Sequence, residues 1–141
     1  MMKKATLIVG ILMCTLLTGC GQVKVGYING ERITKEAPQI KATMDEGSKK
    51  MQEVQQDLVK KMEENPNMSQ EESEKLQTEA QRKAMGYSQQ YITQVQQKLN
   101  VALEEISKEK KIDVVLDNSA YQKSVFMGGE DLTDEAIKKL Q

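Results

Sequence analysis

Apolar residues follow two different spacings along the chain, and the spacings separate short strands from long helices. Residues 23–28 alternate and are rich in β-branched and aromatic types, which predicts a strand. Residues 113–117 and 124–127 predict two more short strands, and Gly128 and Gly129 break the pattern after them. Three such strands do not form a stable sheet alone. The two ends of the chain are therefore expected to meet, and to assemble with further copies.

A first long helix is predicted between the first two strands, from near Ile33 to near Glu64. Its apolar positions recur in alternating steps of four and three, a heptad pattern typical of a helix that packs against one partner helix. Pro38 lies early in this segment, where it either occupies the first turns or kinks the entry. The repeating positions are Ile33, Ala37, Ile40, Met44, Gly47, Met51, Val54 and Leu58.

A second long helix is predicted after a turn at residues 65–67. Ser69 followed by Glu72 forms a capping box that begins this helix, which continues to about Lys110. The tight turn predicts an antiparallel hairpin. The first helix alone would be about 48 Å long, so the hairpin should project as an arm. The apolar series of the second helix is Leu76, Ala80, Ala84, Tyr87, Tyr91, Val95, Leu99, Ala102 and Ile106.

A short helix is predicted at the C-terminal end of the chain. Thr133 is expected to cap it, because threonine is a favoured N-cap residue. Asp134 and Glu135 fall in its first turn and Lys138 and Lys139 in its last, which matches the helix dipole.

Composition limits the chemistry that the chain can perform. The chain has 141 residues, of which 38% are hydrophobic and 4% aromatic, which suits one domain with narrow helical seams. It contains no histidine, so Ser-His and Cys-His nucleophile pairs and histidine metal ligands are excluded. It also lacks a glycine-rich ATP-binding loop of the GxxxxGK[ST] type. We expect no enzyme activity, no metal and no cofactor.

The first 19 residues have the pattern of a lipoprotein signal peptide. Two lysines precede an apolar run over residues 5–17, which is short for a permanent membrane span. The run ends in Leu17-Thr18-Gly19-Cys20, which matches a bacterial lipobox. We therefore expect residues 20–141 as the mature protein, with lipid on Cys20 and at least two acyl chains for stable anchoring. The alternative is an ordinary signal peptide with a chance cysteine.

Methionines and two glycines are the candidate functional residues of the arm. Methionine is flexible and suits surfaces that accept many partners. Met62, Met68 and Met85 lie near the tip or off the seam and are predicted to contact a partner protein, which we call the client. Met44 and Met51 fall on the heptad pattern and are predicted to fill the seam.

The two glycines, Gly47 and Gly86, are predicted to lie at one level of the arm, because each is about equally distant from the turn. Either they allow close helix contact, or they form a hinge about which the outer arm swings.

Charge argues against nucleic acid as a partner. Removal of Lys3 and Lys4 with the signal leaves 18 basic and 21 acidic side chains, a net charge of −3. Residues 60–75 carry three lysines and five glutamates, so the predicted tip is acidic. The chain has no basic stripe for phosphates or for an anionic membrane surface.

Three segments of the sequence resemble the Skp family of periplasmic chaperones, also called OmpH-like proteins. They are KVGYIN at 24–29 with ERI at 31–33 and Pro38, ISKEKKIDVVLD at 106–117, and DLTDEAIKKL at 131–140. The resemblance implies a homotrimer in which strands of three chains form a β body and three arms surround a cavity. It also implies ATP-independent holding of unfolded outer-membrane proteins. Lys111 stands where the family often has a glycine that ends the long helix.

Together these observations predict an α+β fold with a small three-stranded β body, a long antiparallel helical-hairpin arm and a short C-terminal helix, assembled as a trimer. The body is expected over residues 23–30 and 112–141 and the arm over 31–111. The leading hypothesis is a holdase for unfolded outer-membrane or other envelope proteins. We expect it to be lipid-anchored to the membrane facing the periplasm, on the outer membrane if the host has one. The alternative is a structural or adaptor lipoprotein whose arms dock one envelope partner.

The spacing between lipid and body adds one geometric expectation. Only Gly21 and Gln22 separate Cys20 from the first strand residue, Val23, a reach of about 10–14 Å when extended. The body should therefore lie against the membrane, with the arms directed away from the bilayer or along it.

Overall fold

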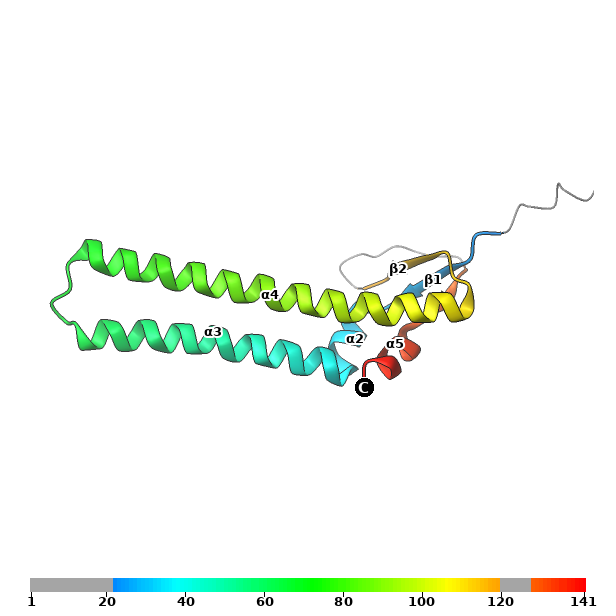
Figure 1. Ribbon diagram of the computed structural model, residues 1–141, viewed down its shortest axis with the longest axis horizontal. Helices are drawn as coiled ribbons and strands as arrows, with labels where there is room; N and C mark the ends of the chain where they lie inside the picture. The colour runs from blue at the N-terminus through cyan, green and yellow to red at the C-terminus, as the bar shows by residue number, and fades with distance from the viewer. Residues whose placement is uncertain (1–21, 120–127) are drawn as a thin grey trace, which may run out of the picture.

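The computed structural model describes residues 22–119 and 128–141. A small sheet and two short helices form a body at one end, and two long helices extend from it side by side (Figure 1). The predicted signal segment, Cys20 and the predicted strand at 124–127 lie outside the described residues. The elements in chain order are β1 (Val25–Ile28), α2 (Gly30–Glu36), α3 (Pro38–Glu64), α4 (Gln70–Lys110), β2 (Val114–Asp117), β3 (Glu130–Asp131) and α5 (Thr133–Lys139).

The sheet joins the two ends of the chain, as predicted from the short strands. β1 is central, with β2 and β3 as parallel neighbours on its two sides. Parallel neighbours need a long crossover connection, and here the whole helical hairpin supplies the crossover from β1 to β2. Among the described residues the third strand is β3, which follows Gly129 directly.

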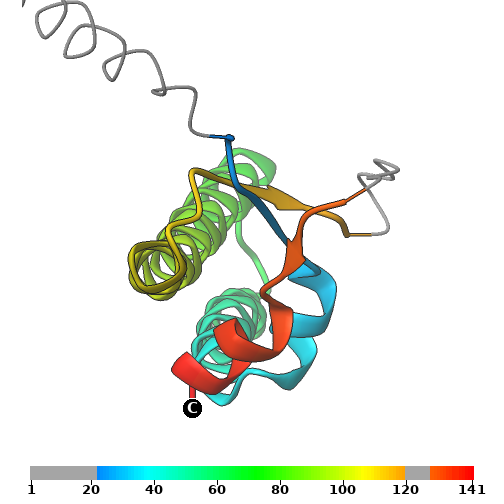
Figure 2. The same cartoon turned by 90° about the vertical axis from the view of Figure 1, so that its right-hand side faces the viewer.

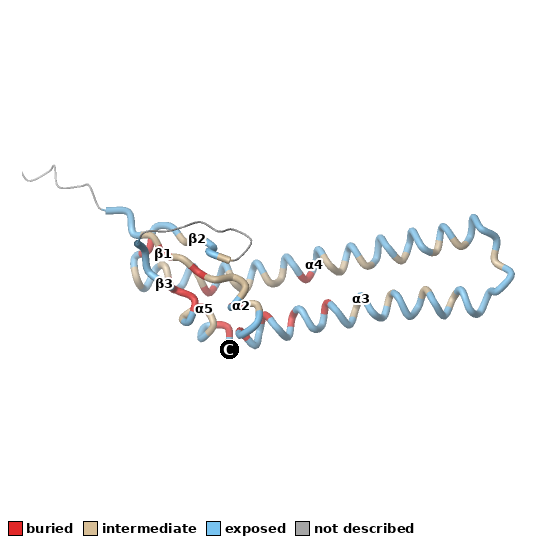
Figure 3. Tube along the Cα trace, turned by 180° about the vertical axis from the view of Figure 1, so that it is seen from behind, coloured by how far each residue is buried: buried red, intermediate tan, exposed pale blue. Residues whose placement is uncertain are grey.

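The hydrophobic core lies where the sheet, the short helices and the roots of the long helices meet. Gly26 of β1 allows this close packing, since a Cβ there would lie 2.5 Å from a Leu132 side-chain carbon. Burial is concentrated in the body and the arm root (Figure 3). The core residues are Ile28, Ile33, Ala37, Ile40, Ala102, Ile106, Ile112, Leu132, Ala136 and Leu140.

The helix predicted to begin near Ile33 is divided into α2 and α3. Ala37 is extended (φ −80°, ψ 114°), and Pro38 is the first residue of α3. Pro38 lacks the N–H that would continue α2, and its ring disfavours helical geometry at Ala37. The short helix α2 packs against α5 in the body, as the view along the arm shows (Figure 2).

Both predicted ends of the second long helix are confirmed. The Ser69 hydroxyl accepts from the Glu72 N–H, and the Glu72 carboxylate accepts from the Ser69 N–H. At the other end Lys111 adopts the left-handed conformation (φ 57°, ψ 46°) that a family glycine would take without strain.

The prediction that Thr133 caps the last helix is wrong. Thr133 is the first residue of α5, and Leu132 is its N-cap. The buried Thr133 hydroxyl instead accepts from the Asn29 N–H at 3.0 Å, which connects α5 to the end of β1. The Asp131 carboxylate accepts from the Thr133 N–H at 2.9 Å, so it takes over the role of the cap.

Candidate functional site

The arm has a tightly packed root and a loosely packed outer part. Every buried residue of α3 lies between Ile40 and Gly47, and every buried residue of α4 lies between Tyr91 and Ile106. From Gly47 around the tip to Tyr91, the seam contains only half-buried side chains such as Leu58 and Leu76. The outer arm therefore has little apolar burial of its own to hold the two helices together.

Gly47 and Tyr91 form the last tight contact before the outer arm. A Cβ on Gly47 would lie 2.8 Å from Tyr91 Cγ and 3.0 Å from Tyr91 Cβ. The ring therefore occupies the space that a side chain at residue 47 would need. Burial raises the pKa of Tyr91, and its interaction with Glu46 raises it further.

The two arm glycines have different surroundings. Gly47 is buried and faces Tyr91, whereas Gly86 is exposed and has nothing within 4 Å of its ideal Cβ position. The two glycines therefore do not lie at one level of the arm, although their equal distances from the turn predicted this. Gly47 instead faces Tyr91, which is five positions beyond Gly86.

An apolar groove of about 400 Å³ runs beside the Gly47–Tyr91 contact. We call it the arm groove. None of its ten lining residues is charged, although 29% of the chain is charged. Its apolar side chains are accessible, with Ile92 49% and Met44 44% exposed. The lining residues are Thr34, Met44, Gly47, Ser48, Met51, Ser88, Tyr91, Ile92, Val95 and Gln96.

The structure differs from the sequence prediction for Met44 and Met51. The seam position is taken by Thr43, which is 4% exposed and accepts a hydrogen bond from Lys98 Nζ at 2.7 Å. The seam is therefore shifted by one residue at this level, and Met44 and Met51 line the arm groove instead.

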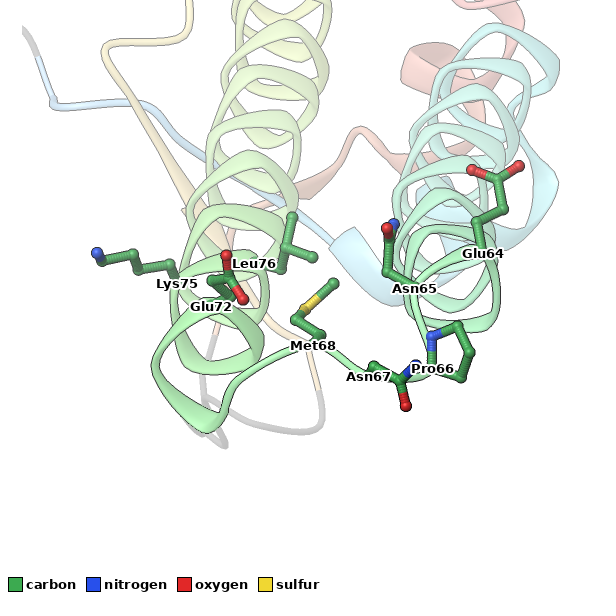
Figure 4. Close-up of a pocket in the computed structure, with 8 residues that line it drawn as sticks. All are labelled: Glu64, Asn65, Pro66, Asn67, Met68, Glu72, Lys75 and Leu76. Atoms are coloured by element: carbon green, nitrogen blue, oxygen red, sulfur yellow. The ribbon is translucent and has the colours of Figure 1, made fainter.

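A second cavity lies at the tip, between the ends of α3 and α4. We call it the tip cleft. It measures about 640 Å³ and is lined by residues 64–68, Glu72, Lys75 and Leu76. The Met68 side chain lies between the two helices on the same side as Leu76, whereas Lys75 is directed away from the cleft (Figure 4). The turn is held by the Met68 N–H, which donates to the Asn65 carbonyl at 3.1 Å.

The three methionines predicted to contact a client protein lie at different places on the arm. Met68 is half-buried in the tip cleft, Met62 is 38% exposed on α3, and Met85 is 72% exposed on α4. The arm groove does not include them. Ile92 was missed by the sequence reasoning. Ile92 is an apolar residue that falls outside the apolar spacing of the second long helix, and this could have indicated an apolar side chain facing away from the seam.

Ion pairs at the arm root attach the long helix to the body. Lys110 of α4 contacts Glu130 of β3 and Glu135 of α5, and these carboxylates raise the pKa of Lys110. Lys139 of α5 contacts Glu109 at 2.7 Å and Glu105 at 3.0 Å. These contacts are partly exposed, so they orient the arm more than they stabilise the fold.

The described residues contain neither a candidate membrane span nor a candidate metal site. Within residues 22–119 and 128–141, no helix has the length and apolar content needed to cross a bilayer. The same residues contain no group of three or more cysteine, aspartate or glutamate side chains placed to hold a metal ion.

These features define an α+β protein in which a small parallel sheet carries a long helical hairpin with an uncharged groove near its root. The chain belongs to the family described as "Outer membrane protein (OmpH-like)", whose model matches residues 24–140. No curated protein matches the sequence significantly.

A crystal structure from Caulobacter crescentus CB15, of a protein assigned as an OmpH-like outer membrane chaperone, is similar to this chain. It has 19% sequence identity and a TM-score of 0.48, with 86% of each chain covered.

Proposed function

We propose that the protein is an ATP-independent holdase of the cell envelope that binds apolar segments of unfolded outer-membrane or other envelope proteins in the arm groove. Membership of the OmpH-like family supports a chaperone kind of role, and not that of an enzyme. The observation that carries the proposal is the groove itself. The groove gathers accessible apolar side chains without a charged residue, and contiguous exposed apolar surface is a feature of binding sites.

The chemistry of the groove suits segments of varied sequence. Met44 and Met51 present flexible thioether side chains that adapt to different apolar shapes. Ser48, Ser88 and Gln96 add uncharged polar groups that can bond to an exposed backbone. A charged segment would lose water without gaining a partner, so the groove favours apolar, uncharged stretches of a client.

The proposal includes a trimer. β1 alternates its side chains, and Gly26 faces the core, so Val25 lies on the opposite face of the sheet. Val114 pairs with Val25 in register, and Leu116 lies two residues along the same strand, so the three share that outer face. An apolar outer face supports assembly of three bodies through their sheets. The mass in solution of the chain beginning at Gly21 tests this directly.

The proposal also includes lipidation of Cys20 after removal of residues 1–19, with the body against the membrane and the arm over residues 31–111 projecting from it. Mass spectrometry of the full chain and of a Cys20→Ser variant tests the anchor, since only the first should gain acyl mass. Strong quenching of a label at Met68→Cys by membrane-buried quenchers would contradict an arm directed away from the bilayer.

Ile92→Glu and Gln90→Glu form a matched pair for testing the holdase activity. Both substitutions introduce one carboxylate on α4, but residues two apart lie about 200° apart around a helix, so Gln90 is on the face opposite the groove. The assay follows light scattering when a urea-unfolded β-barrel protein is diluted into buffer with each variant.

We expect Gln90→Glu to suppress aggregation like the unmodified chain, and Ile92→Glu to need a several-fold higher concentration. Equal suppression by the two variants contradicts the assignment to the groove. Absence of suppression by the unmodified chain contradicts the holdase function and favours an adaptor.

A further inference from the structure

The tip of the arm contains charges that its own folding does not explain. Glu63 and Glu64 lie in the last turn of α3, where the helix dipole is negative and favours cations. Lys60 approaches Glu64 only to 3.8 Å, and Glu63 has no ion-pair partner among the described residues. Residues that oppose the local preference of a helix end are expected mainly at functional sites.

Among the three lysines of the tip, Lys60 pairs loosely with Glu64, and the other two pair with carboxylates outside the cleft. Lys61 pairs with Asp57 and Lys75 pairs with Glu71, each at 2.8 Å. The Glu74 carboxylate accepts a hydrogen bond from the uncharged Gln70 amide at 3.0 Å, and no ion pair within residues 22–119 and 128–141 involves it. The region therefore retains a negative field that a partner can neutralise.

The tip cleft places an apolar floor inside this field. Met68 and Leu76 are half-buried, and the Pro66 ring lies on the opposite side of the cleft near the end of α3 (Figure 4). Glu64 and Glu72 line the cleft, and the only lysine in the lining, Lys75, is directed away from it (Figure 4). The cleft measures about 640 Å³ and is open to solvent, so a side chain of a partner can enter it.

We propose that the tip cleft is a docking site for a segment of a partner protein in which an apolar side chain is flanked by lysine or arginine. The apolar side chain fills the space beside Met68 and Leu76, and the cation lies against the carboxylates of Glu64 and Glu72. Charge complementarity selects this occupant, because an acidic segment would be repelled and a purely polar one would leave the apolar floor exposed. The site is separate from the uncharged arm groove.

The test uses labelled peptides and the full chain reconstituted in phosphatidylcholine nanodiscs, with empty nanodiscs as the blank. The first peptide alternates leucine and lysine with serine spacers. In two matched peptides glutamate replaces lysine, or serine replaces leucine. Fluorescence anisotropy should show binding of the leucine–lysine peptide only, and binding should weaken as salt rises.

A double variant, Glu64→Gln with Glu72→Gln, removes the two carboxylates of the cleft. Glutamine also serves in a capping box, so the start of α4 is retained. The matched control is Glu53→Gln with Glu104→Gln, which removes one exposed lysine-paired carboxylate from each helix away from the tip. We expect the cleft variant to bind the peptide about two- to tenfold more weakly than the control, as loss of two exposed ion pairs would give.

Three outcomes would overturn the proposal. They are equal binding of the lysine and glutamate peptides, equal loss of binding in the cleft and control variants, or a change in oligomeric mass in the cleft variant without a change in peptide binding. The last outcome would identify a second copy of the chain as the occupant. Aggregation suppression should be the same in both double variants, so failure here leaves the holdase proposal standing.

Discussion

The two glycines of the arm should respond in opposite directions to the same substitution. Replacing glycine with alanine in a helix interior stabilises it by up to about 1 kcal/mol. Gly86→Ala should show this gain in full, because nothing lies within 4 Å of the new methyl group. Gly47→Ala places the methyl group 2.8 Å from Tyr91 Cγ, so the same gain is offset by overpacking.

The size of the overpacking follows from which atoms are close. The nearest atoms are Cβ, Cγ and Cδ2 of Tyr91, at the root of the side chain, so the ring cannot rotate out of the way without moving α4. Such overpacking costs about 1–3 kcal/mol. We expect Gly47→Ala to lower the free energy of unfolding by about 0–2 kcal/mol, and the two variants to differ by roughly 1–3 kcal/mol.

Thermal unfolding followed by circular dichroism at 222 nm measures the difference. A domain of this size shifts its midpoint by roughly 4 °C per kcal/mol, so the variants should differ by about 4–12 °C. Protein concentration must be equal, because assembly also raises the midpoint. Equal shifts in the two variants would refute the inferred contact between Gly47 and Tyr91.

The hinge proposed for Gly47 and Gly86 is tested with the variant that carries both alanines. A spin label at Met68→Cys reports the mobility of the tip. If the glycines form a hinge, the double variant should reduce this mobility and alter client capture. Unchanged mobility and capture would leave close packing of Gly47 as the only role for which the structure gives support.

Two further predictions concern the ends of α4. Lys111→Gly should raise the free energy of unfolding by up to about 1 kcal/mol in urea titration, because glycine adopts φ 57° without strain; a loss of stability would contradict this. The pKa of Glu72 is lowered from its ordinary value of 4.5 by the Ser69 backbone N–H, so its stabilisation is present above that pH and is lost as pH falls below it. Glu72→Gln should therefore be less stable than the unmodified chain at pH 7, and the difference should shrink as pH falls below 4.5; a difference independent of pH would exclude the carboxylate as the cause.

Elements with strong local signals could be predicted from the sequence. The capping box at Ser69 and Glu72, the turn at 65–67 and the apolar spacing gave the hairpin, because each depends on neighbours in the chain. The family resemblance placed Lys111 where a glycine often ends the long helix, and the structure shows the left-handed backbone at that position. The order of the sheet was not predicted, since pairing of β1 with β2 and β3 joins residues separated by the whole arm.

The arm groove could not be predicted for a related reason. The heptad pattern assigned Met44 to the seam, but contacts with α4 decide which residue of α3 faces it. Thr43 takes the position, and Lys98 donates a hydrogen bond to its hydroxyl across the interface. A one-residue shift then exposes Met44 and Met51. The role of Thr133 could not be predicted for the same reason. Its hydroxyl accepts a hydrogen bond from Asn29, which is distant in the sequence, and not from its own helix.

Site-specific photo-crosslinking tests the central claim most directly. A photoactivatable residue is placed at position 92 in the arm groove or at position 90 on the opposite face of α4, and a urea-unfolded β-barrel protein is diluted into each variant before illumination. We predict a crosslinked complex from position 92 and little or none from position 90. Equal crosslinking from both positions, or none from position 92 while aggregation is still suppressed, would contradict binding of clients in the arm groove.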